Sequence, residues 1–356
     1  MINVENWEER KAHHEAYWSL QNRRAVIELT ATKEGGSFDW PAPENLLDYW
    51  YNTEWMTASQ RHWMKNTYYG LDAYPFVPVS IGPDLLAGML GLELQYNEAS
   101  EWVRHRDCEL AEFTDFTLRE DNYYYREMER ILQAYTEDAK SGDYIIGTTD
   151  LNTLMDGVAA LVGSENTCYE MMDNPEEVVR VQKAHLELFK QVYARFQKAA
   201  MRYQGGCTNW LGVYSERPAY FISNDFEVML SAEMWEEFVR EPLRDMAAYL
   251  GRCLFHLDGE NVIRHLPAIL SIPEITGVQV QATPAAQNSG LWIPRLKEIQ
   301  AAGKCAWVEA VNAGEVMDYI RNLQPEGLFI RAWVDTEAEA RQLEQAVDAY
   351  YRSQGR

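Results

Sequence analysis

Polar side chains follow most of the short apolar runs in this chain. The run 253–256 continues as His256-Leu257-Asp258-Gly259, and residues two apart in a strand project to the same face, so His256 and Asp258 point together. An imidazole beside a carboxylate can transfer a proton or hold a divalent cation. Comparable positions after other runs hold Glu28, Asp84, Asn224, Asp225, Gln279, Gln281, Glu309 and Arg331.

These side chains divide into two groups of candidates. Four carry groups suited to acid–base chemistry and are the candidate catalytic residues, namely His256, Asp258, Asp225 and Asp84. The candidate substrate contacts add two of the 12 tryptophans, whose faces can stack on a flat or cationic ligand. They are Glu28, Asn224, Gln279, Gln281, Arg331, Trp210 and Trp307.

Each candidate also has a purely structural interpretation, and the sequence leaves these alternatives open. Asp84 and Asp225 could cap a helix or a turn. Asp258 could cap the turn at Gly259, and His256 could be a hydrogen-bonded core histidine. A salt bridge could join Glu309 to Arg331 on the next strand.

Eight short runs rich in β-branched or aromatic residues alternate with longer amphipathic stretches. We predict strands at 25–29, 73–79, 144–147, 220–223, 253–256, 277–280, 305–308 and 328–330. This alternation is typical of βα units around a parallel sheet, and eight such units form a (β/α)₈ barrel, whose active site lies where the strands end. No G-x-G-x-x-G follows a strand, so an open dinucleotide-binding sheet has no support.

The stretches between the strands predict the helices and the domain organisation. Helices are expected at 5–23, 44–66, 84–91, 150–172, 175–203, from Ser231 onward and at 336–352. A barrel interior is normally filled by Val, Ile and Leu, and polar groups there cost free energy unless they bind something. We therefore predict one α/β TIM barrel domain over 1–356, with an N-terminal helical extension over 1–24, that is an enzyme.

The charge of the chain excludes two classes of partner. Its 356 residues include 32 basic and 55 acidic ones, for a net charge of −23, and so negative a surface repels nucleic acids and anionic bilayers. No apolar run approaches the roughly 20 residues of a membrane helix, and the charged start MINVENWEERK is no secretory signal. Five cysteines without a CxxC pair are typical of reduced thiols. We predict a cytoplasmic protein.

Five segments, taken in order, resemble the uroporphyrinogen decarboxylase superfamily, which also contains the cobamide-dependent methyltransferases. They are FVPVSIGPDLLAGMLG (76–91), GTTDLNTLMDGVAALVG (147–163), NPEEVVRVQKAHLELF (174–189), SNDFEVMLSAEMWEEFVREPLRDM (223–246) and LFHLDGENVIRHLPAIL (254–270). The fourth is the most specific, because it resembles the family's fourth-strand loop and its Ser-Pro-x-x-Phe-x-x-Phe-x-x-Pro helix. The resemblance runs from about residue 20 to the end and implies a (β/α)₈ barrel.

The resemblance implies zinc chemistry that this sequence alters. The methyltransferases have His-x-Cys-Gly on the fifth strand and a further Cys near the eighth, and these hold a zinc that lowers the pKa of an acceptor thiol. Here the first pair is His256 and Asp258, and 328–333 contains no Cys, so the thiolate site is lost. A harder divalent-metal site, zinc included, from His256, Asp258 and Glu309 stays open. A corrinoid on a partner protein is the implied acceptor.

The decarboxylases of the superfamily act on a tetra-carboxylated porphyrinogen and have an Arg-rich segment after the first strand. In this chain that segment is Thr30-Ala-Thr-Lys-Glu-Gly-Gly, in which only Lys33 is basic. The expected mouth of the barrel is acidic and would repel a polycarboxylate. We therefore expect a small neutral or cationic substrate.

Four functions stay open. Methyl transfer to a corrinoid or thiol is preferred over a decarboxylase or lyase, in which Asp225 or Asp84 would stabilise positive charge, His256 would be the acid/base group and Arg331 would hold a carboxylate. A carbohydrate-acting enzyme would use Asp258 and Glu309 beside tryptophan platforms. An inactive homologue would only bind a ligand. A homodimer is left open.

Overall fold

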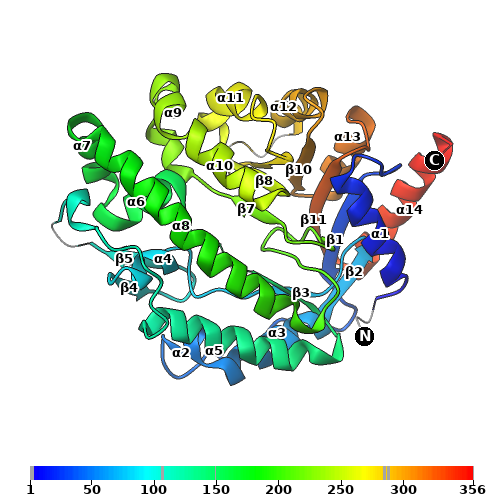
Figure 1. The fold of residues 1–356 in the computed structure, drawn as a ribbon. Helices are drawn as coiled ribbons and strands as arrows, with labels where there is room; N and C mark the ends of the chain where they lie inside the picture. The colour runs from blue at the N-terminus through cyan, green and yellow to red at the C-terminus, as the bar shows by residue number, and fades with distance from the viewer. Residues whose placement is uncertain (1–3, 106–107, 149, 284–285, 287–288, 356) are drawn as a thin grey trace.

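A seven-stranded, mostly parallel sheet forms the centre of the protein (Figure 1). The computed structural model describes residues 4–105, 108–148, 150–283, 286 and 289–355. The strand order is β2–β1–β11–β10–β9–β8–β7, with β2 antiparallel to β1 and the other neighbours parallel. The strands are β1 (Val26–Thr32), β2 (Thr67–Leu71), β7 (Tyr220–Ile222), β8 (Cys253–Asp258), β9 (Gly277–Gln281), β10 (Cys305–Ala310) and β11 (Leu328–Thr336).

Two further strands, β3 (Phe76–Pro78) and β6 (Ile145–Gly147), form a separate parallel pair. The pairing continues where the Val79 N–H donates to the Gly147 carbonyl at 3.2 Å, and a bridge joins Gly147 to Thr208. All eight predicted strands are thus strands in the structure, and the α/β class is confirmed. Within the ladders of the described residues β2 occupies the edge of β1 and β3 pairs with β6, so a closed barrel stays a prediction.

Helices lie outside the strands, and most of them return the chain from one strand to the next (Figure 1). The longer ones are α1 (Trp7–Trp18), α3 (Thr53–Asn66), α5 (Tyr123–Asp138), α6 (Leu154–Val162), α7 (Ser164–Asp173), α8 (Pro175–Ala200), α10 (Arg240–Leu250), α12 (Ser289–Ala301), α13 (Ala313–Asn322) and α14 (Glu337–Ser353). Shorter ones are α2 (Asp48–Tyr51), α4 (Leu85–Met89), α9 (Ala232–Phe238) and α11 (Leu266–Leu270). Two 3₁₀ helices, η4 (Asp225–Met229) and η5 (Glu260–His265), follow β7 and β8.

Local chemistry explains where several helices begin and end. The predicted helix over 150–172 is two helices, because Gly163 has a φ of +87° and ends α6 before α7 begins. The predicted helix over 44–66 is also two, and the Asn52 side chain accepts the Trp55 N–H to start α3. As expected, α9 starts after Ser231, whose hydroxyl accepts the Met234 N–H.

Several elements were absent from the sequence-based prediction. They include β2, the helices α5, α11, α12 and α13, and a hairpin of β4 (Glu93–Tyr96) and β5 (Glu101–Arg104). The hairpin inserts after α4 and brings the buried Glu101 to the backbone N–H of Asp84, just before α4. This insertion supplies one wall of the site described below.

Several of the tryptophans lie in the hydrophobic core. Trp235, Trp292 and Trp307 are almost fully buried. The predicted N-terminal extension contains α1, which contributes buried Tyr17 and Trp18 to a core cluster with Phe329 and Trp307. None of the described helices combines the length and apolar character needed to cross a bilayer.

Candidate functional site

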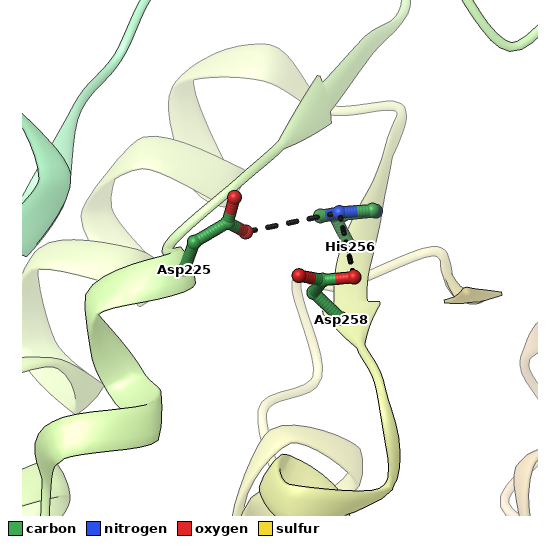
Figure 2. Close-up of side chains that lie close together, drawn as sticks. All are labelled: Asp225, His256 and Asp258. Atoms are coloured by element: carbon green, nitrogen blue, oxygen red, sulfur yellow. Dashed lines mark ion pairs between the residues drawn. The ribbon is translucent and has the colours of Figure 1, made fainter. Parts of the chain in front are cut away.

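His256 lies between two carboxylates at the carboxyl end of β8 (Figure 2). Its Nε2 is 3.7 Å from Asp225 Oδ1 and 3.9 Å from Asp258 Oδ1. One ligand atom from each of the three residues lies within 4.8 Å of the other two. His256 and Asp258 both project from β8, as their spacing predicts, and Asp225 begins η4 shortly after β7. Three of the four predicted catalytic residues are therefore neighbours.

A cavity of about 590 Å³ opens beside this cluster. His256 and Asp225 line it together with Asp84, the fourth predicted catalytic residue. Two acids that were not predicted, Asp150 and Asp156, also line it. Aromatic and apolar side chains complete much of the wall, namely Trp102, Val103, Trp210, Phe226, Val228 and Met229.

Burial raises the pKa of the carboxyl groups in the cavity wall. Desolvation raises the pKa of Asp150 to about 6, against the opposing effect of His256. Desolvation, and then the charge of Asp225, raise the pKa of Asp156 to about 8. Desolvation also raises the pKa of Asp225, which His256 lowers and Asp258 raises further. The described lining residues include no Lys or Arg, so those of its acids that are ionised favour a positive charge in the cavity.

Asp156 also fixes the position of Asp225. Its two carboxylate oxygens accept the backbone N–H groups of Asp225 at 2.8 Å and Phe226 at 2.7 Å, which holds the start of η4. Asp150 accepts the Tyr220 hydroxyl at 3.2 Å. Both acids lie in the segment 147–163 after the third predicted strand, so the rule that active sites lie where strands end could have found them there.

Asp84 is the N-cap residue of α4 by position, but its side chain makes no capping bond. It instead accepts the side-chain amide of Asn152 at 2.7 Å across the cavity wall. Its backbone N–H donates to Glu101 Oε2 at 3.1 Å. Desolvation, and then the charge of Asp84, raise the pKa of Glu101 to about 8. Asp84 therefore does not cap α4 through its side chain; it lines the cavity and lies beside a second acid, Glu101.

Arg331 and Glu28, predicted to contact substrate, bind each other instead of lining the cavity. The guanidinium Nε and Nη2 donate to Glu28 Oε2 at 3.2 and 3.1 Å. The backbone oxygen of Trp210 accepts further bonds from Arg331 at 3.4 Å. Glu28, rather than Glu309, is therefore the salt-bridge partner of Arg331.

The two predicted tryptophan contacts occupy different places. Trp210 lines the cavity, and its ring meets the His256 ring edge-on at a centroid distance of 5.4 Å. Trp307 is 1% exposed, and its indole N–H donates to the Leu211 carbonyl at 3.2 Å. The candidate site accordingly includes Trp210 and leaves out Trp307.

The remaining predicted residues are not among the described lining residues of the cavity. Buried Asn224 accepts the Met155 N–H at 3.0 Å through its side-chain oxygen. Gln279 contacts His256 Nδ1 and also Gln281, which in turn reaches Glu309. The group of possible ligands in the described residues contains Asp225 in the place predicted for Glu309.

The comparisons with known proteins give a fold likeness. No protein-family model and no curated protein sequence matches the chain. Among solved structures, the chain is similar to a methyltransferase from Methanosarcina mazei, with a TM-score of 0.58 and 12% sequence identity. The match covers 96% of this chain and 99% of the other. At this identity the likeness establishes a shared overall fold.

Proposed function

We propose that this chain is a methyl-transfer enzyme that takes a small methylated substrate, cationic or neutral, into the cavity beside His256. The acceptor in this proposal is a thiol or a corrinoid carried by a partner protein. The observation that carries it is the cavity wall, which combines Asp84, Asp150, Asp156 and Asp225 with aromatic faces and has no described Lys or Arg. The fold likeness to a methyltransferase supports methyl transfer among the reactions such a cavity could serve.

A methylated ammonium group matches this wall in both charge and shape. Carboxylates attract its charge at long range, and the indole faces of Trp102 and Trp210 can take its methyl groups at short range. In the transfer itself, the lone pair of the acceptor forms the new bond to the methyl carbon. The electron pair of the carbon–nitrogen bond remains on nitrogen, so a quaternary ammonium leaves as a neutral tertiary amine. The positive charge that the wall stabilises is then lost, which favours product release.

The residues present also fit a divalent metal. Gln279 contacts Nδ1 of His256, so Nε2 is the ring nitrogen that faces Asp225 and Asp258. One imidazole and two carboxylates are a donor set for zinc or a harder cation, and a hydrogen-bonded outer partner for the histidine is typical of metal sites. His256, Asp225 and Asp258 would hold the metal in this proposal. Such a metal would act as a Lewis acid that lowers the pKa of an acceptor thiol.

The decarboxylase alternative has no comparable support. It requires a cation to hold the substrate carboxylate, and Arg331 is bound to Glu28 outside the described lining of the cavity. The acids that do line the cavity would repel a carboxylate. We therefore propose methyl transfer without a second candidate.

Calorimetric titration with tetramethylammonium, tert-butanol and acetate tests the ligand class. These probes are similar in size and differ in charge, and we expect the cation to bind best and acetate to show no binding. Asp225→Asn should weaken the binding of the cation by about ten-fold, the equivalent of one moderate charge interaction of about 1.4 kcal/mol. The exposed Asp245→Asn, which removes the same charge from α10, should leave it unchanged. Acetate binding more tightly than the cation would refute the ligand class.

Metal content and transfer are measured separately. Purified protein equilibrated with zinc should retain one equivalent, and His256→Ala should lose it. Transfer is followed by NMR with a ¹³C-methyl ammonium substrate and a small thiol, in which a new S-methyl signal is expected. If the cation binds but no labelled product forms with either the thiol or an added corrinoid protein, methyl transfer is refuted and the chain is a binding protein.

A further inference from the structure

A row of polar side chains extends from His256 across three neighbouring strands. In the parallel registers, His256 of β8 lies opposite Gln279 of β9, and Asp258 lies opposite Gln281. Gln279 and Gln281 are two apart in β9, so both project to the face that carries His256. Glu309 of β10 ends the row. Gln279 is fully buried, whereas Gln281 and Glu309 are half-buried.

The hydrogen bonds in this row are continuous. Gln281 Nε2 donates to Glu309 Oε2 at 3.5 Å, the long limit for such a bond. Gln279 Nε2 donates to Gln281 Oε1 at 3.1 Å. The oxygen of Gln279 then contacts Nδ1 of His256. Each amide uses its nitrogen on one side and its oxygen on the other.

The end of the row fixes the direction of every bond in it. A carboxylate only accepts hydrogen bonds, so Glu309 requires the amide nitrogen of Gln281. The Gln281 oxygen then faces Gln279 and requires its amide nitrogen, which leaves the Gln279 oxygen facing the imidazole. An amide oxygen also only accepts, so Nδ1 of His256 carries a hydrogen.

We propose that Glu309 is a positioning residue that holds His256 in its Nδ1–H tautomer through Gln281 and Gln279. A neutral imidazole has one N–H, so Nε2 then presents a lone pair toward Asp225 and Asp258. This is the opposite of the tautomer that predominates for histidine in water, which is why the fold must impose it. The inference goes beyond the proposed function, because the row orders the ring with or without a methyl substrate.

The geometry on the other side of the ring agrees with a lone pair at Nε2. The distances of 3.7 and 3.9 Å to Asp225 Oδ1 and Asp258 Oδ1 exceed those of a hydrogen bond. A lone pair facing two carboxylate oxygens is an arrangement that attracts a proton or a metal cation between them. Glu309 therefore prepares His256 as a base or as a ligand, although it lies outside the group of possible metal ligands.

The test is the tautomer itself, read by NMR on full-length protein labelled with ¹⁵N-histidine and free of added metal. Long-range ¹H–¹⁵N correlations distinguish a protonated ring nitrogen from a bare one, and His256→Asn assigns the signal among the seven histidines. At a pH where the ring is neutral, we expect a protonated Nδ1 and a bare Nε2. A protonated Nε2 in the wild type would overturn the proposal at once.

Three variants separate this role from a merely structural one. Glu309→Gln removes the obligate acceptor, so both glutamines can reverse and the two nitrogen signals of His256 should move toward averaged positions. Gln281→Glu combined with Glu309→Gln places a carboxylate one step closer and should restore the wild-type pattern. Asp335→Asn removes an exposed charge from β11 and should change nothing. An unaltered tautomer in Glu309→Gln would overturn the proposal.

Zinc affinity is a second measurement, and it tests the metal site independently of the tautomer. If His256 is a ligand, Glu309→Gln should weaken zinc binding about ten-fold, the low end for loss of an outer hydrogen-bond partner. A changed tautomer with no zinc binding in any variant would refute the metal and leave the role of Glu309 intact. An unchanged tautomer in Glu309→Gln together with tight zinc binding would refute the role of Glu309 and leave the metal site intact.

Discussion

Replacing Arg331 by Met tests whether this arginine is structural, as its contacts indicate, or a clamp for substrate. The guanidinium donates two bonds to Glu28, whose side chain is 7% exposed. Removing the cation leaves a carboxylate buried without its partner. Breaking one side of a buried ion pair typically costs about 3–5 kcal/mol. We expect Arg331→Met to lower the free energy of unfolding by about 4 kcal/mol at neutral pH.

That loss can be converted to a thermal shift. With about 2.1 cal/mol/K of unfolding entropy per residue, a chain of 356 residues has about 0.75 kcal/mol/K, so Tm should fall by about 5 °C. Scanning calorimetry or circular dichroism measures this directly. Glu28→Gln combined with Arg331→Met removes both charges and should recover most of the loss, because replacing a whole buried pair by neutral groups is often tolerated.

The pH dependence of the loss gives a second check. Burial raises the pKa of Glu28 above its ordinary value of 4.5, and Arg331 opposes that rise. Without Arg331 the pKa rises further, so folded protein binds a proton that unfolded protein releases, and stability falls as pH increases above about 4.5. The deficit of Arg331→Met should therefore be largest near pH 8 and smaller at pH 5. An equal deficit at both values, or a double variant as unstable as the single one, would refute the buried-pair explanation.

Three other changes test single contacts. Glu101→Gln should reduce the fall in stability between about pH 4.5 and 8, because the pKa of Glu101 is raised to about 8 in the folded state. Denaturation across this range should give a slope that is lower than the wild-type slope by up to about 1.4 kcal/mol per pH unit, the effect of one proton. Ser231→Ala should cost about 1 kcal/mol of unfolding free energy, because the hydroxyl caps α9 through the Met234 N–H, whereas Ser231→Thr should retain most of it. Gly212→Ala should lower the free energy of unfolding by more than the roughly 1–2 kcal/mol that a left-handed residue costs. The φ of Gly212 is +70°, and the new Cβ would also overlap the Glu28 carboxylate. Wild-type stability of this variant in urea denaturation would contradict the described backbone.

The strands and much of the site were predictable because alternation and strand-end position are local signals. His256 and Asp258 point together because they are two apart in one strand, and this needs no knowledge of the fold. Asp225 joins them because parallel strands end on the same side of a sheet. Helix α5 also has a usable signal, since Asn122 caps it and its buried residues recur at helical spacing, although no helix was predicted there.

Partner choice was not predictable, because it depends on the packing of distant segments. Arg331 has Glu309 opposite it on β10 and Glu28 opposite it on β1, and the registers alone do not select between them. The structure selects Glu28, which is buried beneath the guanidinium. Trp307 is similarly ambiguous, because strand position does not reveal that Arg331 covers its ring and that the Leu211 carbonyl accepts its indole N–H.

The buried acids of this protein are stabilised in different ways, and the difference bears on function. Glu28 has Arg331, and Asp72 has Arg24 with His13, so cations neutralise these two carboxylates. The cavity wall differs, because its described lining contains His256 and His105 beside the acids but no Lys or Arg. The acids of the wall are held by other contacts, since Asp156 accepts two backbone N–H groups and Asp84 accepts the Asn152 amide. A cationic ligand would supply these acids with the positive charge that Arg331 supplies to Glu28, and this supports the proposed ligand class.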